Sequence, residues 1–207
     1  MYSLLLEVRV ADVIGLPLGV LLVTGEKEGI RPQPRWLMTV LNAVINLLRS
    51  VPFLILMIIA LPLSKLIVGT KVGTAATIPP MVIAAFPLVA RMVESSLREV
   101  NQGVVEAAQS MGASALQIVG KVLLPEALPS LISGGTITVG TILGYGAMAG
   151  IIGGGGLGKM AINYGYYNFK FLVMWAAVIG LIILVQVFQS AGTRIAVKCD
   201  KRLRNRS

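Results

Sequence analysis

Long apolar stretches recur along the whole chain, and short polar or charged segments separate them. A helix needs roughly 20 mostly apolar residues to cross the hydrocarbon core of a bilayer. The pattern predicts five such helices, over residues 10–24, 36–66, 74–97, 129–152 and 170–191. The fold class is therefore expected to be all-α: a polytopic membrane protein with a single domain over residues 1–207. An odd number of spans puts the two termini on opposite faces of the membrane.

The first predicted span has the shortest apolar core. Glu7, Arg9 and Asp12 lie at its start, and each charged side chain costs about 2.5–3.5 kcal/mol when it enters hydrocarbon. Two interpretations are open. The helix begins outside the membrane and uses residues 1–12 as its interfacial end, or the chain starts late and part of the span is missing.

Composition supports a membrane protein and excludes several kinds of site. Of the 207 residues, 56% are hydrophobic and 13% charged, and the mean hydropathy is +0.83, against roughly 45–50% apolar residues in ordinary soluble domains. Cys199 is the single cysteine and histidine is absent, so the chain offers neither an internal disulfide nor a metal-ligand pattern. Its carboxylates are not paired in an enclosed segment. We expect no catalysis and no cofactor.

Basic residues predict the orientation in the membrane, because those near the ends of spans are retained in the cytoplasm. One set of loops holds Lys27, Arg31, Arg35, Arg91, Arg98, Lys121, Arg194, Lys198, Lys201, Arg202, Arg204 and Arg206. The opposite set holds only Lys65, Lys71, Lys159 and Lys170. The richer set is expected to face inward. This prediction puts the N-terminus outside and the C-terminus in the cytoplasm.

The net charge of +9 would indicate an anionic partner if the protein were soluble. In a membrane protein, the location of the charges matters more than their sum. We interpret the basic C-terminal tail as an orientation signal that attracts anionic membrane lipid, and we expect no nucleic-acid partner.

One long polar segment, residues 101–128, separates the third and fourth spans and falls on the predicted cytoplasmic side. Residues 106–111 are mostly good helix formers, and Gly112 is placed where a helix end favours positive φ. Ser114 and Gln117 have the spacing of a capping box, which starts a second helix. The segment is therefore predicted to form two helices joined by a tight glycine bend.

Two prolines follow this helix pair. Pro125 and Pro129 remove backbone donors, so the chain is expected to turn again before it enters the membrane at Leu131. From the residues alone, two uses of the 101–128 segment are open. It docks on a partner, or it lies on the lipid headgroups as a plain loop between spans.

The 101–128 segment resembles the EAA signature of permease subunits of bacterial ABC importers. That signature reads EAA, three residues, G, nine residues, I, one residue, LP, and this chain differs only in having valine where isoleucine is usual. The matching residues are Glu106, Ala107, Ala108, Gly112, Val122, Leu124 and Pro125. In that family the signature forms a coupling helix seated on a cytoplasmic ATPase subunit. The resemblance implies that these residues transmit closure of the ATPase pair to the spans.

Other stretches narrow the resemblance. "AAFPLVARMVESSLREV", "KVLLPEALPSLISG" and "YGAMAGIIGGGGLGKMAINYGYYNF" are similar to permeases of bacterial methionine (D-/L-methionine) uptake systems, and the similarity runs over about residues 14–194. It implies a type I ABC importer permease in the cytoplasmic (inner) membrane. The expected assembly is a homodimer of five-span subunits with two cytoplasmic ABC ATPase subunits. An extracytoplasmic binding protein would deliver the small amino-acid substrate, and transport would proceed by alternating access.

Two other functions stay open. The chain could be the permease for another small amino acid or a related solute, because the binding protein supplies most of the selectivity in importers of this class. It could also be a self-contained channel or secondary carrier, in which case the 101–128 segment would lie on the bilayer without an ATPase.

A competing motif lies near the fourth span. Gly153, Gly158 and Lys159 match the G-x-x-x-x-G-K part of a phosphate-binding loop. Met160 stands where that loop needs Ser or Thr to reach magnesium, and no strand is predicted before it. We interpret residues 153–170 as a flexible extracellular turn instead, without bound nucleotide.

Within the membrane, we expect Arg49, Gly144, Tyr145 and Met148 to line the translocation pathway. Arg49 lies between apolar runs, where an ionisable side chain indicates a function by default. The alternative is a cation that reaches towards the cytoplasmic interface or satisfies carbonyl groups freed by Pro52. Met148 is unbranched and deformable, as a gate residue needs to be.

Small residues also predict helix contacts. Glycines four positions apart are typical of closely packed membrane helices, and they occur at 15 and 19, 140 and 144, and 146 and 150. In an importer, the same smooth surface could line a pathway. Arg91 and Glu94 are nearly one helical turn apart and are expected to form an ion pair at the inner end of the third span.

Overall fold

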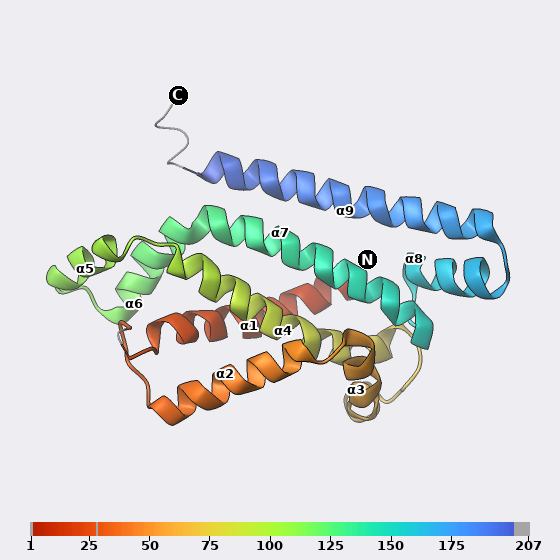
Figure 1. Ribbon diagram of the computed structural model, residues 1–207, viewed down its shortest axis with the longest axis horizontal. Coiled ribbons are helices and arrows are strands. Elements are labelled where there is room, and N and C mark those ends of the chain that lie inside the picture. Colours follow the sequence, from red (N-terminus) through yellow and green to blue (C-terminus); the bar gives the residue numbers. More distant parts are fainter. Residues whose placement is uncertain (1, 28, 201–207) are drawn as a thin grey trace.

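A computed structural model describes residues 2–27 and 29–200 of the protein, with side chains from residue 5 onwards. All regular elements in these residues are helices, without any strand, which confirms the all-α prediction. The tail residues Lys201, Arg202, Arg204 and Arg206 lie outside the described part. Figure 1 shows long helices that run side by side, with short helices gathered at both ends of the molecule.

The centre of the fold is the contact between α1 (Tyr2–Thr24) and α4 (Thr74–Arg98). A Cβ atom added to Gly15 or Gly19 would lie 2.6 Å from a side-chain atom of Val89 or Val93, respectively. The predicted close packing of the first glycine pair is therefore confirmed. Gly15 meets Val89, and Gly19, four residues later, meets Val93, four residues later on α4. The two helices are therefore parallel, and both end at the same face of the molecule.

The second predicted span is not one helix, and this corrects the sequence interpretation. Residues 36–66 form α2 (Arg35–Ser50) and α3 (Phe53–Val68), which are bent by 110° relative to each other. Val51, between them, is extended with ψ 127°. Pro52 explains the bend, because a proline pushes the preceding residue out of the helical region and then favours a new helix start.

The expected turn at Pro125 and Pro129 is also wrong. After α5 (Gln102–Ser110), the chain runs as one continuous helix through α6 (Ala115–Ile118), the π-helical η1 (Val119–Leu123) and α7 (Leu124–Ala149). Pro125 has no N–H to donate, but the π turn directly before it already interrupts the usual i→i−4 hydrogen bonds. The proline therefore removes little further hydrogen bonding from the helix. The fourth span thus extends directly into the second helix of the 101–128 segment.

Residues 153–170 are more ordered than predicted. They contain α8 (Gly156–Lys159) and the π-helical η3 (Met160–Tyr167), after the 3₁₀ turn η2 (Gly150–Ile152). A Cβ on Gly158 would lie 2.3 Å from the carbonyl oxygen of Ala147, so this glycine permits close packing against α7. The expected flexible turn is therefore a folded helical connection, and helix precedes the motif where a phosphate-binding loop would have a strand.

Helix α9 (Phe171–Cys199) lies along α7, and it also contacts η3 and α8. Three helices in the described residues are long and apolar enough to cross a membrane: α4, the continuous Ala115–Ile152 and α9. The bent α2–α3 pair would be a fourth. Any part of α1 long enough to cross would include Glu7, Arg9 and Asp12, and these three charged side chains explain why α1 is not among them. The count of five spans stays a prediction.

Candidate functional site

The 101–128 segment lies at the end of the molecule where α4 finishes and α7 begins (Figure 1). Asn101 caps the start of helix α5: its side-chain oxygen accepts a hydrogen bond from the Gly103 N–H at 2.8 Å. The helix ends before Gly112, which has φ +76°. This left-handed conformation strongly favours glycine. The predicted glycine bend is confirmed.

The second helix of the segment begins with the predicted capping box. The Ser114 hydroxyl accepts from the Gln117 N–H at 3.4 Å, and the Gln117 side chain accepts from the Ser114 N–H at 2.8 Å. These reciprocal bonds satisfy backbone donors at the helix start. The short bend between the two helices is therefore fixed at both sides, by Gly112 and by the box.

The 101–128 segment has a buried face and an exposed face. Val105, Ala108 and Ile118 are buried in the main apolar core, which holds the helix pair against the bundle. On the other side, Met111 and Leu116 are 81% and 84% exposed. Both side chains lie on the face of the helix pair that the bundle leaves uncovered, so this face is open to a partner.

The EAA-signature residues divide between these two faces. Glu106, Ala107, Gly112 and Pro125 are exposed, whereas Ala108 is buried and Val122 and Leu124 are partly buried against the core. Glu106 also borders a hollow of about 480 Å³ that reaches Arg98 and the turn after α1. The signature thus combines positions that fix the segment with positions open to a partner.

An ionic network joins this end of the molecule to α2. The Arg91 guanidinium donates to Glu94 at 2.5 Å and to the side-chain oxygens of Asn42 and Asn46 at 2.7 and 2.9 Å. The predicted Arg91–Glu94 pair is confirmed. Its extension to α2 was not predicted, although the spacing of the two asparagines puts them on one helix face.

The network continues towards the turn between α1 and α2. Arg98 donates to Glu94 at 2.8 Å and also forms an ion pair with Glu26. The side chain of Glu94 is only 10% exposed, so this carboxylate sits between two guanidinium groups with little water. Arg91, Glu94 and Arg98 follow each other at helical spacing, which was the available sequence signal for a charged face.

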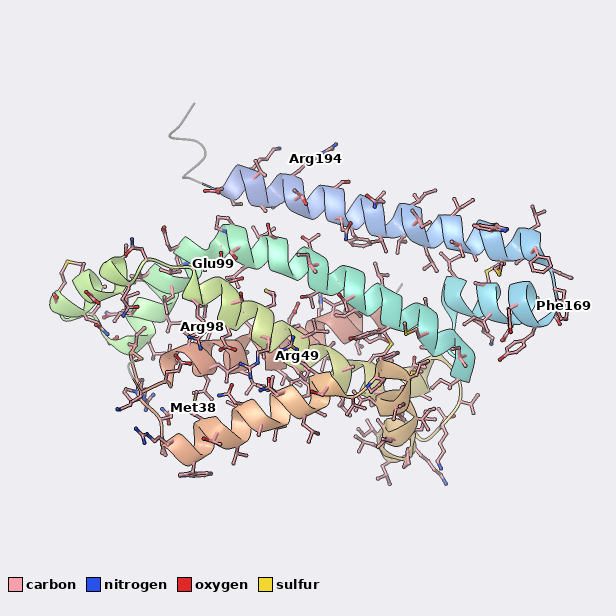
Figure 2. The ribbon with its side chains drawn as sticks, viewed as in Figure 1. Met38, Arg49, Arg98, Glu99, Phe169 and Arg194 are labelled. Carbon is pink, nitrogen blue, oxygen red and sulfur yellow. The ribbon has the colours of Figure 1, made fainter. Side chains whose placement is uncertain are left out.

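Arg49 lies one turn beyond Asn46 on α2, nearer to the middle of the molecule than Arg98 (Figure 2). It borders an open hollow of about 560 Å³ that the ionic network also lines. Within the described residues, Arg49 forms no hydrogen bond or ion pair. It differs in this respect from Arg91 and Arg98, whose charges are compensated by carboxylates.

A smaller cavity of about 250 Å³ lies on the other side of Arg49. Apolar groups of α2, α3 and α4 form most of its wall, and α7 contributes Thr141 and Tyr145. The Tyr145 ring stacks on Phe53 with 4.2 Å between ring centroids. The structure thus brings Arg49 and Tyr145 to one cavity.

The other two expected pathway residues, Gly144 and Met148, lie on the same side of α7. Thr141, Gly144 and Met148 follow each other at helical spacing, and Gly144 and Met148 are exposed. A Cβ on Gly144 would meet no atom within 4 Å, whereas one on Gly150 would lie 2.5 Å from the Lys159 nitrogen. Close packing therefore explains Gly150 but not Gly144. The stripe of α7 formed by Thr141, Gly144 and Met148 is open in the isolated chain.

Residues 15–205 match the family model described as "Binding-protein-dependent transport system inner membrane component". The chain belongs to this family. Its members are components of membrane transport systems and not enzymes, as the sequence predicted. The described residues contain no group of three or more acidic, His or Cys side chains that could hold a metal ion.

Similar members of the family have named substrates. The chain is 50% identical over 202 residues to the probable D-methionine transport system permease protein MetI of Vibrio cholerae, covering 98% of this chain and 89% of that protein. It is 46% identical over 164 residues to the methionine import system permease protein MetP of Bacillus subtilis, covering 79% and 74%.

Solved structures of this family of inner membrane components show the same fold. The chain superimposes on inward-facing structures of the MetNI methionine ABC transporter with a TM-score of 0.93 and 42% identity, over 97% of this chain and 92% of the other. An amino acid ABC transporter crystallised with histidines shares the fold at a TM-score of 0.73 and 17% identity. The fold is therefore that of an ABC importer permease.

Proposed function

We propose that this protein is the translocation subunit of an ATP-driven importer for methionine. The observation that carries the proposal is the agreement of fold and sequence with a methionine ABC transporter, at a TM-score of 0.93 and 42% identity over nearly the whole chain. The two relatives from Vibrio cholerae and Bacillus subtilis are also named as permeases for methionine, the first of them as a probable one. A permease for another small amino acid is the main alternative, because the binding protein supplies most of the selectivity in importers of this class.

The coupling surface of this importer is the exposed face of the 101–128 segment. Glu106, Ala107 and Gly112 are open to a partner, with exposed apolar side chains beside them. Ala108, Val122 and Leu124 anchor the segment in the core, and Pro125 follows the π turn that joins it to α7. An ATPase subunit that pushes on this surface would therefore move α7 directly, because no flexible joint separates them.

We propose that this end of the molecule faces the cytoplasm. Helices α1 and α4 are parallel and both finish here, and the turn after α1 and the end of α9 lie at the same end (Figure 1). Lys27, Arg31, Arg35, Arg98, Lys121 and Lys198 gather at this end, so the positive-inside rule favours the orientation. The N-terminus would then lie outside and the C-terminus inside.

The translocation pathway is proposed to follow α7 and the end of α2. Arg49 and Tyr145 share a cavity, and Gly144 and Met148 continue along the same exposed stripe of α7. In one subunit this stripe has no cover. A second copy of the chain facing it would enclose a path between the two subunits, with an extracytoplasmic binding protein delivering substrate and lipid surrounding the outer helices.

Co-purification tests the proposed assembly. The affinity-tagged protein, extracted in mild detergent from its own bacterium, is expected to retain a cytoplasmic ABC ATPase in a 2:2 complex, because the exposed face of the 101–128 segment needs a partner. Mass measurement of the intact complex gives the stoichiometry. Leu116→Asp should release the ATPase, whereas Lys65→Asp, on α3 at the opposite end, should not. Isolation of the wild-type protein as a monomer or as a dimer without ATPase would contradict the assembly.

A further inference from the structure

Arg49 lies well inside the membrane if α2 runs across it. It is fourteen positions from Arg35, and at about 1.5 Å per residue this is roughly 20 Å along the helix, compared with a hydrocarbon core of about 30 Å. The ionic network holds the turns of α2 that precede it, since Arg91 donates to Asn42 and Asn46, and Asn46 lies one turn before Arg49. The helix α2 is therefore anchored on the side that presents Arg49.

The charge of Arg49 is the uncompensated charge in this region. The hollow beside it is lined by Arg91 and Arg98, which are balanced by Glu94 and Glu26. Arg49 adds one positive charge and has no hydrogen-bonding partner among the described residues. The negative end of the α2 dipole is close, which lowers the cost of the cation. Because Arg49 has no such partner, its guanidinium donors are free to bind an anion.

The cavity next to Arg49 has the character of a small ligand site. Its volume is about 250 Å³, below the roughly 300–1,000 Å³ of pockets for drug-sized ligands. Leu56, Leu88 and the stacked Phe53–Tyr145 pair provide apolar walls, and Thr141 adds a hydroxyl. One cation beside an apolar slot matches a ligand with one carboxylate and an apolar side chain.

We infer that this cavity is a subsite in which Arg49 binds the α-carboxylate of an amino acid while its apolar side chain lies against Phe53 and Tyr145. The inference rests on the proposed function and adds to it the chemical class of the ligand and its mode of binding. Arg guanidinium groups bind carboxylates through two parallel hydrogen bonds. The subsite would hold the substrate at mid-depth, between delivery and release.

A cysteine reporter tests the subsite. Cys199 is the single native cysteine, so Cys199→Ser with Thr141→Cys leaves one thiol at the cavity. Thr141 is partly exposed, and its hydroxyl bonds only to the Ile137 carbonyl, so the substitution is mild. The rate of modification by a small cationic methanethiosulfonate is measured by mass spectrometry in the nucleotide-free complex with its ATPase. Val51→Cys, at the same cavity, provides a second reporter.

Methionine is expected to slow the modification, and methioninol, which has a hydroxyl in place of the carboxylate, is not. Arg49→Gln should raise the methionine concentration needed for protection about tenfold to a hundredfold, as expected for loss of a hydrogen bond to a charged group. Arg49→Lys should retain part of the protection by methionine, because lysine keeps the positive charge. Arg35→Gln removes the same charge from the first turn of α2, away from the cavity. This variant should retain the full protection by methionine.

Equal protection by methionine and methioninol, or full protection in Arg49→Gln at both reporters, would overturn the subsite. Uptake by the same reporter complex, with its binding protein and ATP, is measured in parallel. Uptake without protection by methionine would exclude the subsite and leave the proposed function intact. Absence of methionine uptake by the wild-type complex would count against the proposed function itself.

Discussion

Proline at position 112 is expected to abolish methionine uptake and leave the protein folded in the membrane. Gly112 has φ +76°, whereas proline is locked near −65°. The Gly112 N–H also donates to the Gln109 carbonyl at 2.9 Å, and proline has no N–H. The bend between α5 and α6 must therefore change direction, and the exposed face would no longer match the ATPase. ATP-dependent uptake in vesicles measures the loss.

Two variants make this result specific. Gly112→Asn should retain most of the uptake, because asparagine tolerates the left-handed conformation better than other residues with a side chain. Glu106→Lys reverses an exposed charge on α5 without altering the bend, and should uncouple transport from ATP hydrolysis. Normal uptake by Gly112→Pro, at normal levels of the protein in the membrane, would contradict a coupling role for this segment.

Glu94→Leu is expected to destabilise the protein and slow transport. The Glu94 carboxylate accepts bonds from Arg91 and Arg98 and has little contact with water. Its removal leaves two guanidinium groups near each other without their shared anion, which should cost about 3 kcal/mol. For a chain of this size, the thermal midpoint in detergent should fall by about 5–10 °C.

Glu99→Leu is the matched control. Glu99 is exposed at the end of α4, close to Arg98 in the chain (Figure 2). The substitution removes the same charge and adds the same side chain, but it is expected to change the free energy of unfolding by less than about 0.5 kcal/mol. Equal midpoints for the Glu94 and Glu99 variants would show that the network contributes no measurable stability.

Local features were predictable from the sequence where neighbouring residues determine them. The glycine bend at Gly112 and the Ser114–Gln117 box depend on residues three to five positions apart, and both are confirmed. Prolines were harder to interpret, because the same residue can end, bend or begin a helix. Pro52 marks a 110° bend inside a predicted span, while Pro125 lies in a continuous helix after a π turn.

The candidate site could be predicted only in part, because its contacts join distant segments. Arg49 and Tyr145 were each expected on the pathway, but nothing in their spacing indicates a shared cavity with Phe53. Likewise, Asn42 and Asn46 bind Arg91 from 49 and 45 positions away. Such contacts depend on how α2 packs against α4, and α2 itself was predicted as part of a longer span.

Transport by the reconstituted complex tests the central claim most directly. The protein is placed in proteoliposomes with its ATPase, with ATP on the side of the 101–128 segment and the binding protein with radiolabelled methionine on the other. We expect accumulation of methionine on the ATP side that requires ATP, the ATPase and the binding protein together. Methionine flux through the protein alone, unaffected by removing ATP or the ATPase, would contradict the account.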